Sequence, residues 1–73
     1  MTDRQWIALK QMTQRVVFEC DMSLGKVRLQ PSDLYSYELI YPSHIVTLHK
    51  DDYISSVDKH YLRSMYNEWL SRI

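Results

Sequence analysis

The stretch that decides the fold is residues 35–49, YSYELIYPSHIVTLH. Apolar and polar side chains alternate on both sides of Pro42-Ser43, which is the pattern of two half-buried strands joined by a turn. Pro42 has no N–H to donate and favours a chain reversal. We expect a hairpin with arms at residues 35–41 and 44–49. One face of its first arm would hold Tyr35, Tyr37, Leu39 and Tyr41, and one face of its second arm would hold Val46 and Leu48.

Helical patterns flank this hairpin. We expect a helix over residues 2–14. Trp6, Leu9 and Thr13, together with Val16 just beyond this range, recur at helical spacing, and Ile7 and Met12 widen the stripe. Thr2 or Asp3 can cap its N-terminus. The last segment has a suitable cap in Ser55, with Asp58 three residues on, and predicts a helix over about residues 56–71. Its apolar face would hold Val57, Tyr61, Leu62, Met65, Trp69, Leu70 and Ile73.

Residues 16–30 favour a second hairpin. Its strands would be residues 16–20 and 26–30, joined by a five-residue loop that ends at Gly25, the only glycine in the chain. Residues 31–33, Pro-Ser-Asp, would then form a turn. The alternative is one long helix from the N-terminus through Cys20. We expect an α+β domain with an N-terminal helix, three to four short antiparallel strands and a C-terminal amphipathic helix.

Length and cysteine content set limits on the type of protein. Residues 1–73 make a single domain, with flexibility allowed for its first few residues. A pocket of roughly 300 Å³ or more is hard to form in so small a core, which argues against an enzyme. The lone Cys20 is expected to be a buried thiol in a reducing compartment. Without a long apolar run or a signal-peptide pattern, we expect a cytoplasmic protein with no membrane contact.

The nine basic and nine acidic residues cancel, but they are unevenly distributed. Residues 1–30 hold five basic and three acidic side chains, a net charge of +2, whereas residues 31–73 hold four basic and six acidic ones, a net of −2. Such an asymmetry can orient a protein on a partner. It is too weak for a phosphate-binding stripe, which normally needs a basic excess over the whole domain.

Residue patterns for metal or catalytic chemistry are weak. Cys20, His44, His49 and His60 could supply zinc ligands, but their spacing matches no standard site. Asp51-Asp52 could ligate Mg²⁺. A better explanation is that they precede the last helix, where negative charge is favourable near the positive N-terminal end. No turn of the G-x-S-x-G type positions a nucleophile. We therefore expect no catalytic residue, no metal and no cofactor.

Contact with a partner is the best remaining interpretation. The second half is crowded with tyrosines, of which about half could be buried, and exposed Tyr, Trp and Arg are typical of protein interfaces. The basic first part is the predicted contact, formed by Arg4, Trp6, Lys10, Arg15, Lys26 and Arg28. Two alternatives remain: a nucleic-acid-binding module that uses the same residues, and a homo-oligomeric structural protein that buries its tyrosines against itself.

The short chain, which opens Met1-Thr2-Asp3-Arg4-Gln5-Trp6, resembles the small regulators that lytic bacteriophages make to bind host RNA polymerase, such as the short transcription inhibitors and antiterminators of Xanthomonas phage. The resemblance implies binding to the β′ subunit, in the host cytoplasm. It further implies hindered promoter engagement, through loss of σ contacts, and changed termination. It carries no diagnostic motif and assigns no binding residue. Our own expectation is a non-enzymatic protein that is a monomer.

Overall fold

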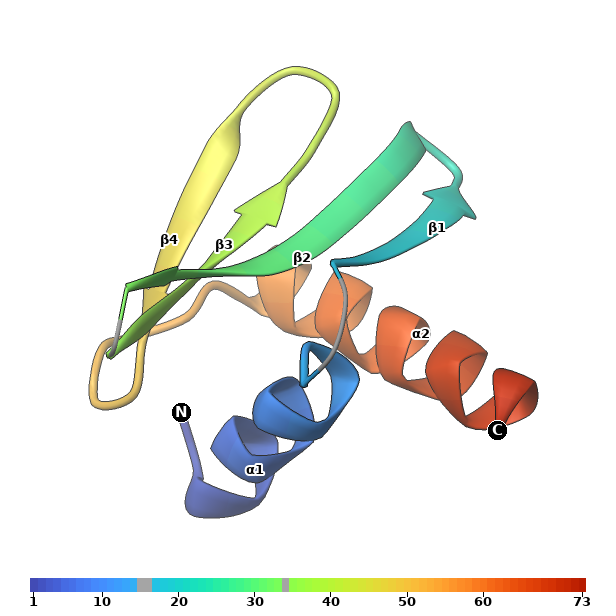
Figure 1. Ribbon diagram of the computed structural model, residues 1–73. Helices are drawn as coiled ribbons and strands as arrows, with labels where there is room; N and C mark the ends of the chain where they lie inside the picture. The colour runs from blue at the N-terminus through green and yellow to red at the C-terminus, as the bar shows by residue number, and fades with distance from the viewer. Residues whose placement is uncertain (15–16, 34) are drawn as a thin grey trace.

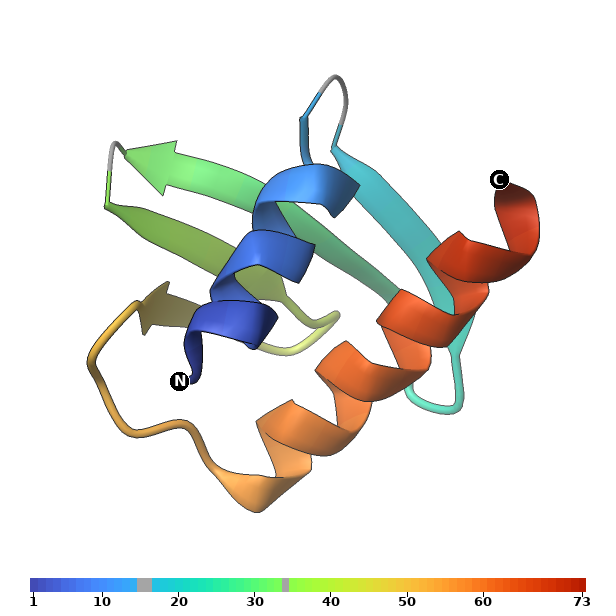
Figure 2. The ribbon, with the colours of Figure 1, turned by 90° about the horizontal axis from the view of Figure 1, so that it is seen from below.

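A computed structural model describes residues 1–14, 17–33 and 35–73 of the chain. The elements are α1 (Asp3–Met12), β1 (Phe18–Met22), β2 (Gly25–Asp33), β3 (Ser36–Ile40), β4 (Ile45–His49) and α2 (Ser56–Arg72). The four strands form one antiparallel sheet in chain order. Both helices cover the same face of this sheet and leave its other face open (Figures 1 and 2). The predicted α+β class is confirmed.

The hairpin of residues 35–49 forms as expected. Tyr37 pairs with Leu48 and Leu39 with Val46, and the N–H of Tyr41 donates to the carbonyl of His44 at 2.8 Å to close the Pro42-Ser43 turn. Tyr37, Leu39 and Leu48 are buried, so the predicted inward face is confirmed at these positions.

Tyr35 departs from that face, because its side chain is 76% exposed. Its N–H donates to the carboxylate of Asp33 at 2.8 Å, which holds Tyr35 in the connection ahead of β3. Alternation of side chains applies only within a strand, and β3 begins one residue later, at Ser36. The prediction that Tyr35 shares a face with Tyr37 was therefore wrong.

The first hairpin exists, but its loop is shorter than expected. Asp21 pairs with Lys26 and Met22 with Gly25, so only Ser23 and Leu24 connect β1 to β2. Gly25 has a φ of 114°, a conformation that L side chains rarely adopt, and this lets the strand start directly after a two-residue turn. The expected loop of five residues was wrong, since Asp21 and Met22 belong to β1.

Replacing Gly25 with alanine is expected to destabilise the domain by about 1–3 kcal/mol. A Cβ at this position would lie 3.0 Å from Cγ of Pro42, and the φ of 114° would be strained in any case. Urea unfolding followed by circular dichroism measures the change. Leu24→Ala, in the same turn, is the control and should leave stability almost unchanged. Equal midpoints for Gly25→Ala and the wild type would contradict the assigned backbone conformation.

The prediction of a turn at residues 31–33 was also wrong. β2 continues to Asp33, and its register with β3 shifts between Pro31 and Asp33, which marks a β-bulge. Among the described residues, the pairing of β1 with β2 ends at Leu29, and Pro31 pairs with Tyr37 of β3. A proline has no N–H to donate to a neighbouring strand, and within sheets it is tolerated at bulges such as this one.

α1 ends well before the first strand. Thr2 is its N-cap and forms a reciprocal capping box with Gln5, while the helix closes at Thr13, whose hydroxyl donates to the carbonyl of Leu9 at 2.8 Å. The alternative of one helix through Cys20 was therefore wrong. The predicted start of the first strand at Val16 lies outside the described residues, and β1 begins at Phe18.

α2 begins at the predicted cap and runs one residue longer than predicted, to Arg72. Tyr61 and Met65 face the core, and Leu62 and Trp69 are half-buried against it. The remaining members of the predicted apolar face, Val57, Leu70 and Ile73, are exposed. The prediction that these three positions belong to the covered face of the helix was therefore wrong.

A hydrogen-bond network ties the β3–β4 hairpin to the start of α2. The hydroxyl of Tyr41 donates to Oδ1 of Asp58 at 2.6 Å, and the hydroxyl of Ser55 donates to Oδ2 of the same carboxylate at 2.8 Å. The ring of Tyr41 packs edge-on against Tyr61 and stacks on His44. Burial, together with the bond to Asp58, raises the pKa of the Tyr41 phenol well above its ordinary value.

The raised pKa of Tyr41 predicts a loss of stability in alkali. In the unfolded chain a tyrosine ionises near pH 10, while the folded protein still holds the Tyr41 proton, so rising pH favours unfolding above about pH 10. The urea midpoint, followed from neutral pH to about pH 11, should fall less steeply for Tyr41→Phe than for the wild type. Tyr53→Phe is the control, since Tyr53 is 88% exposed. Parallel curves for wild type and Tyr41→Phe would refute this role.

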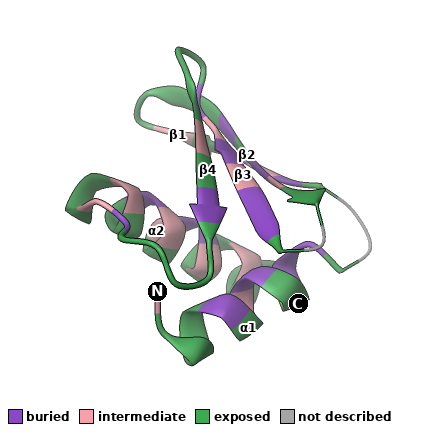
Figure 3. Ribbon diagram, turned by 90° about the vertical axis from the view of Figure 1, so that its left-hand side faces the viewer, coloured by how far each residue is buried: buried purple, intermediate pink, exposed green. Residues whose placement is uncertain are grey.

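The core fills the layer between the sheet and the two helices (Figure 3). Leu29, Leu39 and Met65 are its largest fully buried side chains. Cys20 is also buried, as expected, and is a free thiol. Among the described residues, no helix is long and apolar enough to cross a bilayer.

Candidate functional site

The six residues predicted to contact a partner do not form one surface. Arg4 and Lys10 are exposed on α1, and Arg15 lies outside the described residues. Trp6 is in the core, 7% exposed, with its ring edge-on to Tyr37 at a centroid distance of 5.0 Å. The expectation that Trp6 supplies contact area is therefore corrected, because its ring is already covered by this protein's own sheet.

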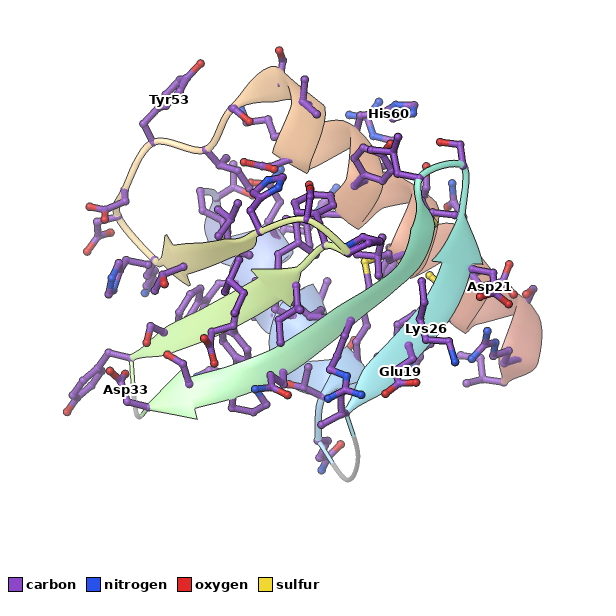
Figure 4. The ribbon with its side chains drawn as sticks, turned by 90° about the horizontal axis from the view of Figure 1, so that it is seen from above. Glu19, Asp21, Lys26, Asp33, Tyr53 and His60 are labelled. Atoms are coloured by element: carbon purple, nitrogen blue, oxygen red, sulfur yellow. The ribbon has the colours of Figure 1, made fainter. Side chains whose placement is uncertain are left out.

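Lys26 and Arg28 lie on the opposite side of the molecule from α1. They alternate along β2 with the buried Val27 and Leu29, and therefore point to the open face of the sheet, where Figure 4 shows Lys26 beside Glu19. Glu19 forms ion pairs with both, at 3.8 Å to Lys26 and 2.6 Å to Arg28. One carboxylate thus offsets part of the charge of these two basic side chains.

A groove between α1 and α2 is the best candidate site. It has a volume of about 550 Å³, and we name it the helix groove. Figure 2 shows the two helices that supply most of its lining, side by side on one face of the sheet. Its apolar lining is Met1, Ile7, Ala8, Leu9, Met12, Leu62 and Tyr66. The expectation from chain size concerned a pocket formed in the core, whereas this hollow lies between two helices.

A basic rim surrounds this apolar lining. Arg4 reaches the helix groove from α1, and Lys59 and Arg63 reach it from α2, while Gln5 and Gln11 add neutral polar groups. All three basic side chains are exposed. No aspartate or glutamate of the described residues lines the groove. The site therefore combines apolar surface with a positive edge.

Ile7 is the apolar residue of the helix groove that is most open to solvent, with 54% of its surface exposed. The stripe that α1 turns to the core is Trp6, Leu9 and Met12. Ile7 lies outside that stripe, so its exposure follows from the helical period and not from poor packing. An exposed isoleucine beside half-buried Leu62 and Tyr66 leaves apolar surface available for a partner.

Sequence reasoning missed the α2 half of this site. Lys59 and Arg63 were not among the predicted contact residues, and Ile7 was taken as an extension of the helical stripe. The spacing of four between Lys59 and Arg63 does predict that they share one side of α2. Which helix this side adjoins depends on how α1 and α2 pack on the sheet, and no local pattern contains that information.

A second hollow lies beside the β4–α2 connection and includes Lys10, His49, Asp51 and Asp52. It is mostly polar, and Lys50 at its edge pairs with Asp3 at 3.4 Å. Within the described ranges, no three His, Cys, Asp or Glu side chains come close enough together to hold a metal ion.

Cys20 does not contribute to either hollow. It packs in the core with its sulfur 3.5 Å from that of Met22, and burial raises the pKa of its thiol. A buried, protonated thiol is a poor nucleophile.

Comparisons of the chain with protein-family models, with curated proteins and with solved structures returned no match. Interpretation of the helix groove therefore depends on its own geometry and charge.

Proposed function

We propose that this protein is a non-enzymatic regulator that binds a large macromolecular partner, with bacterial RNA polymerase, through its β′ subunit, as the specific candidate. The observation that carries the proposal is the helix groove, an apolar hollow of about 550 Å³ with an exposed Ile7 and a basic rim. Surfaces that join an apolar centre to a charged edge are typical of protein interfaces. The candidate partner itself comes from the resemblance of the short chain to phage regulators.

Regulation would work by occlusion. A rigid domain only 28 × 27 × 20 Å in extent can occupy a surface that another factor needs without carrying any activity of its own. On a polymerase in the host cytoplasm, the result would be inhibited initiation or altered termination. The basic rim would speed the encounter with an acidic surface, and the apolar lining would slow dissociation.

The lining of the helix groove supports a binding role over a catalytic one. Its described residues include no His, Cys, Ser, Thr, Asp or Glu, which leaves Lys59 and Tyr66 as the side chains able to act as nucleophile or general base. Arginine, lysine and glutamine can position a partner but do not by themselves make a nucleophile–base pair.

A protein partner is favoured over free nucleic acid. Lys26 and Arg28, the two basic residues on the open sheet face, are already paired with Glu19. The lining of the helix groove has one aromatic ring among its described residues, that of Tyr66, whereas single-strand binding uses successive stacked aromatic rings along a basic track. We therefore place nucleic acid in the test as an alternative outcome.

The test measures binding to purified bacterial RNA polymerase. The wild-type protein is immobilised and exposed to core enzyme, to holoenzyme and to free duplex DNA and RNA at several salt concentrations, and run-off transcription is measured alongside. We expect binding to the enzyme and a change in initiation or termination. Absence of both would exclude the polymerase as the partner. Binding to nucleic acid alone, falling steeply with salt, would instead establish the nucleic-acid module.

Oligomeric state tests the structural alternative. Sedimentation at two widely spaced protein concentrations should give a monomer at both. A concentration-dependent dimer or larger species that no longer binds the enzyme would favour a homo-oligomeric protein over a regulator.

A further inference from the structure

We propose that the helix groove binds an acidic amphipathic α-helix of the partner. This inference rests on the proposed function only in taking a protein as the partner, and it adds the chemistry and the conformation of the bound segment. Three observations carry it: the apolar lining, the distribution of unpaired basic side chains, and the helical walls of the groove.

The apolar lining calls for an apolar face on the occupant. Ile7 and Ala8 from α1 lie opposite Leu62 and Tyr66 from α2. Covering Ile7, which is 54% exposed, would remove apolar surface from water. Helices that bind in grooves do this with apolar side chains spaced three and four residues apart.

The unpaired positive charges gather at this groove. Of the basic side chains that the structure describes, Lys26, Arg28, Lys50 and Arg72 form salt bridges. In the same described part of the chain, Arg4, Lys10, Lys59 and Arg63 form none, and all of these except Lys10 line the helix groove. Three of the four described basic side chains that form no salt bridge thus lie around one apolar surface, which an acidic partner segment would complement.

The walls of the groove select a helix over an extended strand. α1 and α2 satisfy their backbone hydrogen bonds internally, so between their ends they offer no free backbone partners. An extended segment would bury unpaired N–H and C=O groups against Ile7 and Leu62, which is unfavourable. A helical segment brings its own backbone bonds and presents only side chains.

A second copy of this chain fits the groove poorly. α1 carries Asp3 against Arg4 and Lys10, and α2 carries Asp58 and Glu68 against Lys59, Arg63 and Arg72. Each helix therefore has a net charge of +1, and either one would bring like charge to the basic rim.

The experiment uses three synthetic probes on the full-length protein. The first is a fluorescently labelled peptide of roughly 18 residues, long enough to form a helix, with leucines at helical spacing and glutamates flanking them. The second replaces each glutamate with lysine, and the third scrambles the first. Fluorescence anisotropy gives affinities, and amide chemical shifts locate the site. We expect the acidic amphipathic peptide to bind at least about tenfold more tightly than either control.

Matched variants separate the helix groove from the rest of the surface. Ile7→Glu should weaken the acidic peptide at least about tenfold, whereas Ile45→Glu should leave its affinity within about twofold, since Ile45 is similarly exposed (56%) but lies on the sheet. The double variant Lys59→Glu, Arg63→Glu should also lower the affinity for the acidic peptide about tenfold. Lys10→Glu, on α1 but outside the groove, is the charge control. Urea unfolding of each variant verifies that it is folded.

Several results would overturn the inference. One is equal affinity for the acidic and the basic peptide, and another is an equal effect of Ile7→Glu and Ile45→Glu on that affinity. A third is a set of amide chemical-shift changes confined to the open sheet face. A fourth is a groove that binds a second copy, anionic vesicles or nucleic acid instead. If the Ile7→Glu variant still binds the polymerase, the helix groove is not the binding site, and the proposed function stands. If the protein binds the acidic peptide tightly but does not bind the polymerase, the helix groove is supported as a binding site and the polymerase is excluded as the partner.

Discussion

Replacing Trp6 with alanine is expected to destabilise the domain by about 3–5 kcal/mol. A chain of this length has a total stability of roughly 4–11 kcal/mol, so this loss is a large fraction of the total. The cause is the position of the indole, which is 7% exposed and packs edge-on against Tyr37 at 5.0 Å. Urea unfolding followed by circular dichroism measures the loss.

The result for Trp6 also decides between two roles that its sequence position allows. A tryptophan at a partner interface would lower affinity when replaced and leave stability nearly unchanged. Ile7→Ala is the control from the same helix. Because Ile7 is 54% exposed, this replacement should lower the free energy of unfolding by less than about 1 kcal/mol. If Trp6→Ala were as stable as Ile7→Ala, the placement of α1 on the sheet would be incorrect.

Leu39→Ala is expected to cost about 2–5 kcal/mol, the second of the two largest effects. Leu39 is fully buried, lies on β3 between Leu29 and Val46, and faces the layer that holds both helices. Removal of its side chain leaves a cavity that paired strands on both sides cannot close, because their ladders fix the backbone.

Leu24→Ala is the control for this measurement. The same atoms are removed, but Leu24 is 63% exposed in the β1–β2 turn, so the change should stay within about 0.5 kcal/mol. A loss of less than about 1 kcal/mol for Leu39→Ala would show that the interior is loosely packed.

Most of the fold was predictable because its signals are local. The alternation in residues 35–49, the turn at Pro42-Ser43 and the caps at Thr2 and Ser55 each depend on residues within a few positions of one another. The errors fell where two local signals compete. Pro31-Ser32-Asp33 has turn composition but forms a bulge inside β2, because pairing with β3 outweighs local preference.

The candidate site was predicted only in part. Arg4 belongs to the helix groove, but Lys59, Arg63 and Ile7 were not assigned to a contact, and Lys26 and Arg28 lie on the other side of the sheet. Summing charge over residues 1–30 grouped side chains that are neighbours in sequence and separated in space. The charges that matter are the unpaired ones, and pairing is known only once Glu19 is seen beside Lys26 and Arg28.

The sequence by itself determined the kinds of elements, their order, and which side of each strand is apolar, since these follow from chain geometry with periods of two and 3.6 residues. The tertiary structure alone decided that Trp6 is core, that Tyr35 is exposed and that α1 and α2 share one face of the sheet. The physical reason is that burial and charge compensation depend on residues distant in sequence. The helix groove exists because two such helices lie side by side.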